Sequence, residues 1–593
     1  MGLLVALVAL TTPAPAQPTI PAGQAIETFN RVQQWVRDWD MPARDDSSAA
    51  TAPVSAAVVT LRLDGRVFGR GAAATPDPSP MLVWEAAGEA FNSAAGKLTT
   101  ERDATWESSL EQLGGRITIS LEIADELIPI SANELAMPGF GYSPGAMGVA
   151  VRRGDRTEAI GAGSMLMRET DMARSAMALA NSLAGGTDTM LRSPVELAEA
   201  GFAFYRFEPV VLAQPAPGLG AAFVDRGGRV IETSEISVRS LETLADRIAG
   251  HLIGRRWSGV ERYGFTGTLD PVTGRTESNW ASPFEQAISA YALLRYGQPM
   301  ETAAHRHAFQ TGRQVLRDLA AVEEGEAMPW EDPLGASMAV IALSQLQLVN
   351  ILADDELNTL RLNALETLDR LYSDDDGFAE GVPDAAGGLI AHALASSARL
   401  DPRDRTGLAR SAVRAVFLET PQTALVTQMP FLGWAELELA GEEEVPASSA
   451  LQAMRELVWE HQLRRSDLSW SDRDLSGGIV FTGARAPLPS WVSMRPLAFI
   501  ASMLGDERLT PGSAASGEVP AEIGRMIDSL RFVRQLVAEG EIMHLYSAHD
   551  RAHWGVRMAL WDQRMPVEVD AMALLVLTET LESIERISAR SSP

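Results

Sequence analysis

The sequence predicts an α+β domain over residues 54–232, followed by an all-α domain over residues 237–586. In the first region, apolar residues recur with a period of two between glycine-containing turns. In the second, an amphipathic helical segment, a loop and an apolar helical segment follow one another six times. Helix pairs repeated roughly every 50 residues bury a continuous core only by stacking. The predicted fold is therefore multidomain, with an N-terminal α+β domain followed by an (α/α)6 toroid of six outer/inner helix pairs.

The inner helices are predicted from segments rich in Ala, Leu and Met, whose few charges are typical of helices packed on both sides. They begin near Pro283, Pro333, Asp384, Pro430, Pro489 and Pro566. The outer helices carry charged side chains on one face, as expected for an outer ring that meets water. They are predicted over residues 237–255, 301–322, 355–372, 405–417, 447–463 and 521–538.

Composition and charge limit the classes of function. The chain has 593 residues, 46% hydrophobic and 22% charged, as expected for a globular protein long enough for more than one core. The net charge of −28 argues against nucleic acid and anionic membrane surfaces as partners. Cysteine is absent, which excludes disulfides, thiolate metal sites and a cysteine nucleophile. The sequence predicts no particular oligomeric state.

The first residues predict export. Residues 2–10 are apolar, and Ala14, Pro15 and Ala16 form an A-x-A pattern typical of a signal-peptide cleavage site. The apolar run is too short to span a bilayer, and no other segment is long and apolar enough to do so. We therefore expect a signal peptide over residues 1–16 and a periplasmic or extracellular protein; a proline-rich tail is the alternative.

The region before the toroid combines helices and strands. Residues 17–53 predict a helix at 26–39 and a linker, and the strands at 54–73 form a hairpin across Asp64 and Gly65. Helices are predicted at 81–95, 105–113 and 171–184, the last capped by Asp171. Further strands are predicted at 116–124, 147–154, 202–209 and 221–232. Residues 587–593 are predicted to be a disordered tail.

The order of these elements resembles an AMMECR1-like domain over about residues 54–185. The matching stretches are AAVVTLRLDGRVFGRGAAA, ITISLEIADELIPIS and SPGAMGVAVRRGDRTEAIGAGSMLM. The glycine segment that contains a cysteine in that family falls at residues 68–72, where this chain has none. The resemblance therefore implies the α+β fold and no activity.

The helical region is similar to the α/α toroids of glycan-processing enzymes and of terpene-cyclase-like proteins, because charged helices alternate with helices rich in small residues. The acidic run Asp374–Asp375–Asp376–Gly377 lacks the spacing of the acidic motif used in terpene chemistry and is expected to be a solvated turn. The resemblance therefore implies glycan rather than terpene chemistry.

The loops of the toroid are asymmetric. Connections from outer to inner helices are long, at 256–281, 323–333, 373–384, 419–430, 463–490 and 539–566, whereas most return connections are short. Long loops on a rigid scaffold commonly carry binding sites. They gather around the N-termini of the inner helices, where free N–H groups favour anionic or hydroxyl-rich ligands.

Tryptophans in these loops are candidates for binding a glycan, because aromatic faces match the C–H faces of sugar rings. The candidate binding residues are Trp280, Trp330, Trp470, Trp491 and Trp554, with Trp257 and Trp561 in the same loops. The alternative is that these side chains simply hold the loops against the helices.

Carboxylates near the starts of the inner helices are candidates for catalysis, since a glycoside hydrolase needs one protonated and one ionised carboxyl group. The candidate catalytic residues are Glu285, Asp332, Asp384, Asp472, His549 and Asp562. For Asp332 and Asp384, helix capping is the competing interpretation.

A loop with His544, His549, His553 and Asp550 could hold a metal or serve as acid and base in an epimerase, but its spacing matches no metal motif. No phosphate-binding, dinucleotide-binding or serine-hydrolase motif occurs. We predict neither a metal nor a cofactor.

Two functional hypotheses follow. The first is an exported protein whose toroid cleft binds a polysaccharide and acts as a glycoside hydrolase, lyase or epimerase. The alternative is a non-catalytic scaffold whose toroid rim grips a peptide or protein partner. Two carboxyl groups, or a histidine and a carboxyl group, that converge in a concave pocket, at least one of them with a shifted pKa, distinguish the first hypothesis from the second.

Overall fold

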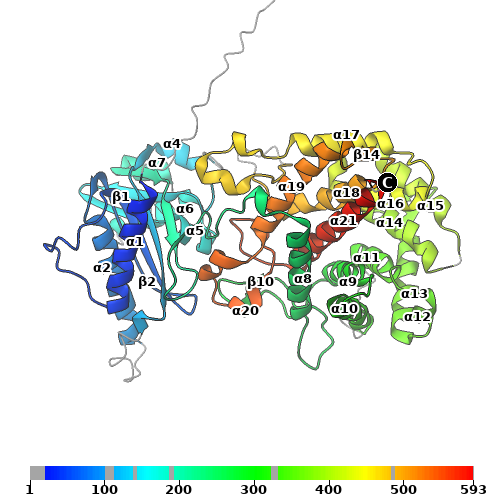
Figure 1. Cartoon of the computed structure of the whole chain (residues 1–593), viewed down its shortest axis with the longest axis horizontal. Helices are drawn as coiled ribbons and strands as arrows, with labels where there is room; N and C mark the ends of the chain where they lie inside the picture. Colours follow the sequence, from blue (N-terminus) through cyan, green and yellow to red (C-terminus); the bar gives the residue numbers. More distant parts are fainter. Residues whose placement is uncertain are drawn as a thin grey trace, which may run out of the picture. The chain divides into compact units, whose positions relative to one another are not determined.

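The computed structural model describes residues 20–100, 113–137, 143–185, 193–321, 332–401, 403–481 and 488–591. The chain divides into two compact units (Figure 1). The mixed unit comprises the chain up to Val230 together with Leu463–Ser476, and the helical unit comprises Ile231–Gln462 and the chain from Gly477 onward. The predicted toroid was one continuous stretch, so the assignment of Leu463–Ser476 to it was wrong: this segment packs with the mixed unit.

The mixed unit contains two antiparallel sheets and short helices. Its helices are α1 (Ala22–Asp38), α2 (Leu82–Thr100), α4 (Ala132–Ala136), α5 (Ala162–Arg168), α6 (Met172–Leu183) and α7 (Pro194–Glu199). Its strands are β1 (Val54–Leu63), β2 (Arg66–Ser79), β3 (Ile117–Ala124), β4 (Ile128–Ile130), β5 (Gly148–Arg153), β6 (Arg156–Ile160), β7 (Phe202–Phe207), β8 (Val210–Ala213) and β9 (Ala222–Phe223). The segment Leu463–Ser476 adds two 3-10 turns, η5 (Arg465–Asp467) and η6 (Trp470–Leu475).

The larger sheet has the strand order β2-β1-β3-β8-β9, and the smaller has the order β4-β7-β5-β6. Alternate residues of β1 and β3, such as Val59 and Leu121, point to a core that also contains Phe29 and Val32 of α1 and residues of α2. In Figure 1, α1 and α2 accordingly lie beside β1 and β2. The predicted hairpin is confirmed, because β1 pairs with β2 across Asp64 and Gly65.

Two local predictions in this unit are also confirmed. Asp64 and Gly65 both have positive φ, of 48° and 75°, which suits a two-residue turn between twisted strands. Asp171 caps α6 by accepting a hydrogen bond of 2.7 Å from the backbone N–H of Arg174. The strand predicted at 221–232 is reduced to β9 and a single bridge between Asp225 and Gly228.

The helical unit consists mainly of helices joined by loops. Its helices are α8 (Val238–Gly254), α9 (Pro283–Gly297), α10 (Ala303–Ala320), α11 (Pro333–Leu343), α12 (Leu348–Leu352), α13 (Asp355–Leu371), α14 (Gly387–Ser396), α15 (Thr406–Glu419), α16 (Phe431–Ala440), α17 (Ser448–Glu460), α18 (Met494–Gly505), α19 (Val519–Leu536), α20 (His549–Ala552) and α21 (Val567–Ser591). The prediction of sheets in the N-terminal part and helices thereafter is confirmed.

The loops of the helical unit contain short elements. The two-residue strands are β10 (Leu269–Asp270), β11 (Arg275–Thr276), β12 (Tyr372–Ser373), β13 (Gly377–Phe378), β14 (Gly512–Ser513) and β15 (Ser516–Gly517). The 3-10 turns are η1 (Thr233–Glu235), η2 (Asp384–Ala386), η3 (Ser397–Arg399), η4 (Gln422–Gln428), η7 (Trp491–Ser493) and η8 (Gly540–Leu545).

Most residues of helices α9, α11, α14, α16, α18 and α21, which we call the ring helices, are buried. Each contacts the next in this order, and α21 contacts α9, so the contacts close a ring. The starts of two ring helices show how the sequence defines their ends. Ser282, directly before Pro283, forms a capping box with Glu285, and Asp332, directly before Pro333, caps α11.

The C-terminal boundary predicted from the sequence was wrong. Residues 587–593 were expected to be a disordered tail, whereas α21 continues to Ser591. Ile587 is buried against Leu504 and Val519, so apolar packing extends the helix beyond the end expected from its polar sequence.

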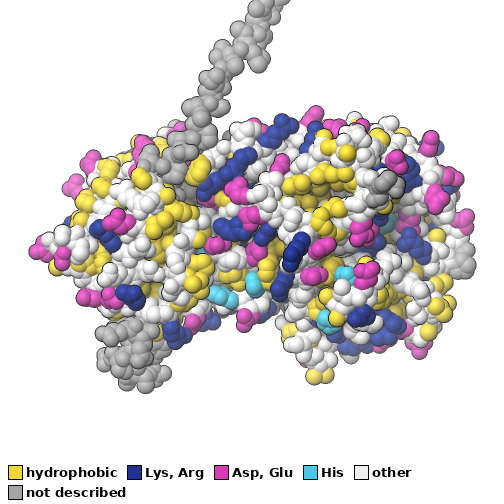
Figure 2. Space-filling model, in the orientation of Figure 1, with side chains coloured by type: hydrophobic (Ala, Val, Ile, Leu, Met, Phe, Trp, Pro, Cys, Tyr) yellow, Lys and Arg dark blue, Asp and Glu magenta, His cyan; other side chains and the backbone are white. Residues whose placement is uncertain are grey.

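Several predictions fall outside the described residues, among them the signal peptide at 1–16, the helix at 105–113 and Trp330. Within the described part of the chain, none of the helices has the length and apolar character needed to cross a membrane. Over the face drawn in Figure 2, acidic and basic side chains are intermingled. The large negative charge of the chain is thus not collected into one acidic surface on that face.

Candidate functional site

Three charged side chains meet at the N-terminal ends of neighbouring ring helices. Helix α21 contacts both α9 and α18, and each of the three carries a charged residue near its start: Glu285 on α9, Arg495 on α18 and Glu568 on α21, where the buried Asp570 follows in the same turn. All three side chains belong to half-buried residues, although the segments around them are apolar and buried. We call these residues the helix-start site.

Glu568 has the most altered acidity in this site. Burial, and after it the negative charge of Glu285, raises the pKa of the Glu568 carboxyl group to about 7, against the opposing charge of Arg495. A carboxyl group that titrates near neutral pH can both donate and accept a proton under physiological conditions. The helix-start site therefore contains a group suited to acid/base chemistry.

Arg495 supplies the positive charge of the helix-start site but forms no ion pair with the carboxylates of that site. Its Nη2 donates a hydrogen bond of 3.1 Å to the backbone carbonyl of Thr427, which fixes the guanidinium group. Arg495 forms no ion pair with a carboxylate of the described residues, and burial lowers its pKa while Glu568 opposes that effect. The guanidinium group thus lies near Glu568 without a salt bridge that would keep that carboxyl group ionised.

Glu285 is held in place by the residue that caps its helix. One carboxylate oxygen, Oε2, accepts hydrogen bonds of 2.8 Å from both the backbone N–H and the hydroxyl group of Ser282. Both hydrogen bonds go to the same oxygen, and Oε1 receives no hydrogen bond within the described part of the chain. The Glu285 carboxylate is therefore held in a fixed position, and its Oε1 is available to contact a ligand.

A row of aromatic side chains lies in the loop that leads to Glu285. The ring centroids of Trp257 and Tyr263 are 5.4 Å apart, and those of Tyr263 and Trp280 are 6.5 Å apart. All three side chains are half-buried, so part of each ring faces solvent. Partly exposed aromatic faces in a row are typical of surfaces that bind sugar rings.

Helix α9 anchors this loop through Gln286, the residue after Glu285. The buried Gln286 amide donates to the carbonyls of Tyr263 and Phe265, at 2.8 and 3.1 Å, and accepts from the N–H of Phe265 at 2.8 Å. The same loop pairs with the segment before α21, where Leu269 and Met565 exchange hydrogen bonds of 2.9 and 3.1 Å. The aromatic row is thus tied to the helices that carry Glu285 and Glu568.

Three predicted catalytic aspartates lie elsewhere in the helical unit. Asp332 accepts from the N–H groups of Leu334 and Gly335, both at 3.1 Å, so the capping interpretation is confirmed for this residue. Asp384 is exposed and caps no helix through its side chain. Asp562 accepts 2.9 and 2.6 Å hydrogen bonds from Arg564, which hold it in a tight turn.

The predicted histidine loop does not bring its side chains together. His549 is exposed at the start of α20, while His553 stacks on Trp554 at 4.7 Å between ring centroids. His544 is buried, with its Nδ1 2.6 Å from the carbonyl of Glu541. Within the described ranges, no group of three or more His, Cys, Asp or Glu residues is arranged to hold a metal ion.

The remaining predicted tryptophans each have their own contacts. Trp491 begins η7, and its backbone N–H donates a 2.8 Å hydrogen bond to the backbone carbonyl of Met558. Trp554 is half-buried between His553 and the guanidinium group of Arg247, which lies 5.6 Å from the ring centroid. Trp470 and Asp472 belong to the mixed unit.

Sequence reasoning selected Glu285 and missed Glu568 and Arg495. Arg495 is the one charge in the segment SMRPLAF, and Glu568 shares the first turn of its helix, in PVEVDAM, with the buried Asp570. A charge in the first turn of a helix packed on both sides is therefore the pattern that identifies Arg495 and Glu568, since burial there needs a compensating role.

No protein-family model matches the chain, and neither does any curated protein. Several solved structures are similar to it, and three of them follow. An uncharacterized protein, PH0010, from Pyrococcus horikoshii has 12% identity and a TM-score of 0.23, with coverage of 34% of this chain and 96% of its own.

The other two structures are enzymes. Cellobiose 2-epimerase from Spirochaeta thermophila has 12% identity and a TM-score of 0.39, and covers 58% of this chain and 98% of its own. A family 76 glycoside hydrolase from a bovine Bacteroides thetaiotaomicron strain has 8% identity and a TM-score of 0.35, and covers 79% of this chain and 96% of its own. Scores this low carry no inference about activity, which has to come from the residues of this chain.

Proposed function

We propose that the helical unit is an (α/α)6 toroid of six outer/inner helix pairs that binds a glycan and transforms it by acid/base chemistry at Glu285 and Glu568. The closed ring of contacts among the ring helices supports the toroid. The observation that carries the chemistry is the carboxyl group of Glu568, whose pKa is raised to about 7 beside a second carboxylate. Export by the predicted signal peptide would place the protein where polysaccharides occur.

In the proposed reaction, Glu568 is the acid and Glu285 the base. Protonated Glu568 donates its proton to the oxygen of the bond that breaks, while the ionised Glu285 accepts a proton from water or attacks the sugar carbon. This step describes a hydrolase, in which water either is the nucleophile or later hydrolyses the glycosyl-enzyme. In a lyase the base would remove a proton from a sugar carbon while the acid protonates the departing glycosidic oxygen. In an epimerase the base would remove a proton from a sugar carbon and the acid would return one to the opposite face, with the glycosidic bond intact. The three reaction types are therefore separated by their products.

The aromatic row supplies the binding surface in this proposal. Trp257, Tyr263 and Trp280 would stack against the apolar faces of successive sugar rings, and the N–H groups at the starts of the ring helices would meet hydroxyl groups. Arg495, which has no salt bridge, would face a polar or anionic group of the ligand. The alternative is a scaffold that only binds a partner. Such a scaffold has no use for a carboxyl group with a pKa near neutral pH.

The test is an activity screen of the full chain on a panel of polysaccharides, with chromatographic analysis of the products. Hydrolysis yields new reducing ends, elimination yields an unsaturated sugar, and epimerisation yields a diastereomer. We expect the Glu568→Gln variant to lose activity by about 100- to 10,000-fold while it still binds the glycan.

Glu585→Gln is the matched control, because Glu585 lies on the same helix and is exposed. This variant should retain the activity of the unmodified protein. If Glu568→Gln stays as active as Glu585→Gln, the assignment of the acid is wrong. If a glycan binds and no product forms with the unmodified protein, the scaffold alternative replaces the enzyme.

A further inference from the structure

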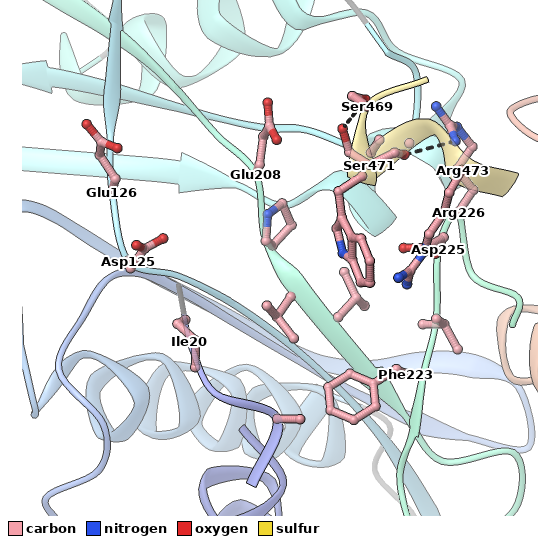
Figure 3. Close-up of a pocket in the computed structure, with 18 of the residues that line it drawn as sticks. Ile20, Asp125, Glu126, Glu208, Phe223, Asp225, Arg226, Ser469, Ser471 and Arg473 are labelled. Atoms are coloured by element: carbon pink, nitrogen blue, oxygen red, sulfur yellow. Dashed lines mark hydrogen bonds and ion pairs between the residues drawn. The ribbon is translucent and has the colours of Figure 1, made fainter. Parts of the chain in front are cut away.

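The mixed unit contains a pocket of about 800 Å³ that is separate from the helix-start site. Its walls come from the turn after β3, the β7–β8 connection, the segment around β9 and the segment Leu463–Ser476. Figure 3 shows Asp125 and Glu126 on one side of this pocket, Ser469 and Arg473 on the other, and Glu208 between them. The volume lies within the range of roughly 300–1,000 Å³ that is typical of small-ligand sites.

The two arginines of the pocket wall are already neutralised within the wall. Arg226, with a side chain only 1% exposed, forms ion pairs with Asp472 at 2.6 Å and with Asp474. Arg473 forms an ion pair with Asp225 at 2.7 Å. Two guanidinium groups thus face three carboxylates. Burial, and after it the charge of Asp474, raises the pKa of Asp225.

Three more carboxylates line the pocket without a cation of their own. Asp125, Glu126 and Glu208 form no ion pair and accept no side-chain hydrogen bond within the described residues. Glu126 and Glu208 are exposed and Asp125 is half-buried. Like charges gathered around a concave surface concentrate the local field, so the pocket attracts positive charge.

The rest of the lining is apolar and aromatic. Trp470 and Phe223 are large aromatic residues that stay 38% and 36% exposed, and Ile20, Ile128 and Val210 extend the apolar surface. The Trp470 ring is held by the Arg473 guanidinium group, which lies 3.9 Å from its centroid. Aromatic faces bind organic cations through the ring quadrupole, and the apolar wall would cover the body of such a ligand.

We propose that this pocket binds an organic cation with an apolar body, recognised through an amine or guanidine group by Asp125, Glu126 and Glu208 and through its carbon chain by Trp470 and Phe223. A neutral sugar could stack on the same rings, but it would leave three carboxylates without a partner. The surplus of negative charge therefore selects a cation. The pocket does not depend on the activity of the helix-start site.

The test is isothermal titration calorimetry on the full chain with two isosteric probes. Nα-acetyl-arginine amide carries a guanidinium group, and Nα-acetyl-citrulline amide replaces it by a neutral urea of the same shape. We expect the arginine compound to bind at least about tenfold more tightly and to weaken as salt is added. Agmatine and spermidine distinguish a free amine from the side chain of a basic peptide as the natural source.

Substitutions of residues that line the pocket test whether the arginine compound binds there. Glu208→Gln should weaken the arginine compound by about two- to fivefold, and Trp470→Ala by about three- to thirtyfold. Glu199→Gln removes the same charge from the exposed end of α7 and should leave binding unchanged. Trp470→Phe keeps an aromatic face and should retain part of the affinity, which separates loss of the contact from loss of the fold.

The proposal is overturned if no cationic probe binds at millimolar concentration, or if the citrulline compound binds as tightly as the arginine compound. An effect of Glu199→Gln as large as that of Glu208→Gln would also contradict it. Binding by agmatine, by spermidine or by the arginine compound, with the expected loss in Glu208→Gln, supports it.

Discussion

Two carboxylates, Asp472 of the mixed unit and Glu568 of the helical unit, are held in opposite ways. In the mixed unit, Arg226 contacts Asp472 and Asp474 directly, and although burial acts the other way, Arg226 and the hydrogen bonds from Ser143 and Ser469 lower the pKa of Asp472. In the helical unit, Arg495 forms no ion pair with Glu568, and burial together with Glu285 raises the pKa of Glu568. A guanidinium group in contact keeps a carboxylate ionised, whereas one that stands apart leaves it able to carry a proton.

This difference separates a structural role from a chemical one. An ionised carboxylate paired with arginine exchanges no proton near neutral pH, so Asp472 serves to hold the segment Leu463–Ser476 in the mixed unit. A half-buried carboxyl group with a pKa of about 7 is costly for stability and useful for catalysis. Substitution of Arg226 should therefore lower the free energy of unfolding, whereas substitution of Glu568 should remove activity.

The largest effect is expected from Arg226→Ala. The substitution would remove the guanidinium group that Asp472 and Asp474 share, and Asp474 is fully buried, so the free energy of unfolding should fall by about 3–5 kcal/mol. Chemical denaturation of the full chain measures this loss. Arg116→Ala is the control, because its ion pair with Asp64 is exposed and should be worth at most about 1 kcal/mol. Equal losses in both variants would show that the cluster is not what holds the segment.

A smaller and reciprocal effect is expected from the two tryptophans. Trp280→Ala should weaken glycan binding by about two- to tenfold and leave binding of the arginine compound unchanged. Trp470→Ala should do the reverse, because Trp470 lies in the mixed unit. Affinity measurements of both variants with both ligands test the separation of the sites, and an equal loss of both ligands in either variant contradicts it.

The smallest effects should appear as shifts along the pH axis. Glu285→Gln removes the negative charge that raises the pKa of Glu568, so that pKa should fall, while Arg495→Gln should raise it. Activity that needs protonated Glu568 is lost as the pH rises through the pKa, so the alkaline limb of the activity should move up in Arg495→Gln. Rate measurements between pH 5 and pH 9 record this shift, and a limb that moves down would exclude Glu568 as the acid. Glu285→Gln lacks the proposed base, so the pKa of Glu568 in that variant is measured by NMR titration instead of by activity.

The same titration affects stability. The pKa of Glu568 is higher in the folded chain than its ordinary value of 4.5. Its contribution to the free energy of unfolding is therefore fully present below pH 4.5 and is lost as the pH rises through about 7. Glu568→Gln should remove this part of the pH dependence, which denaturation at pH 5 and pH 8 measures.

Local patterns in the sequence were sufficient for much of the fold. Proline and a capping residue mark the starts of α9 and α11, and the helical period marks the faces of α8, α10 and α13. The prediction placed the glycan site at the N-termini of the inner helices, and Glu285 is one of the residues that meet there.

Other features depend on pairings that no local pattern records. Asp472 appeared to be a rim residue because its loop is long, but its partner Arg226 lies 246 positions earlier in the chain. Glu568 was not among the predicted catalytic residues, because the sequence alone does not show which carboxyl group lacks an ion pair with a cation. The end of α21 was misplaced because Ile587 is buried by residues far from it in sequence.

The most direct test is a titration of the Glu568 carboxyl group by NMR of the full chain, with the resonance assigned from Glu568→Gln. The structure predicts a midpoint at about pH 7, which moves down in Glu285→Gln. A midpoint near the ordinary value of 4.5 that does not respond to Glu285→Gln would contradict the helix-start site as a centre of acid/base chemistry.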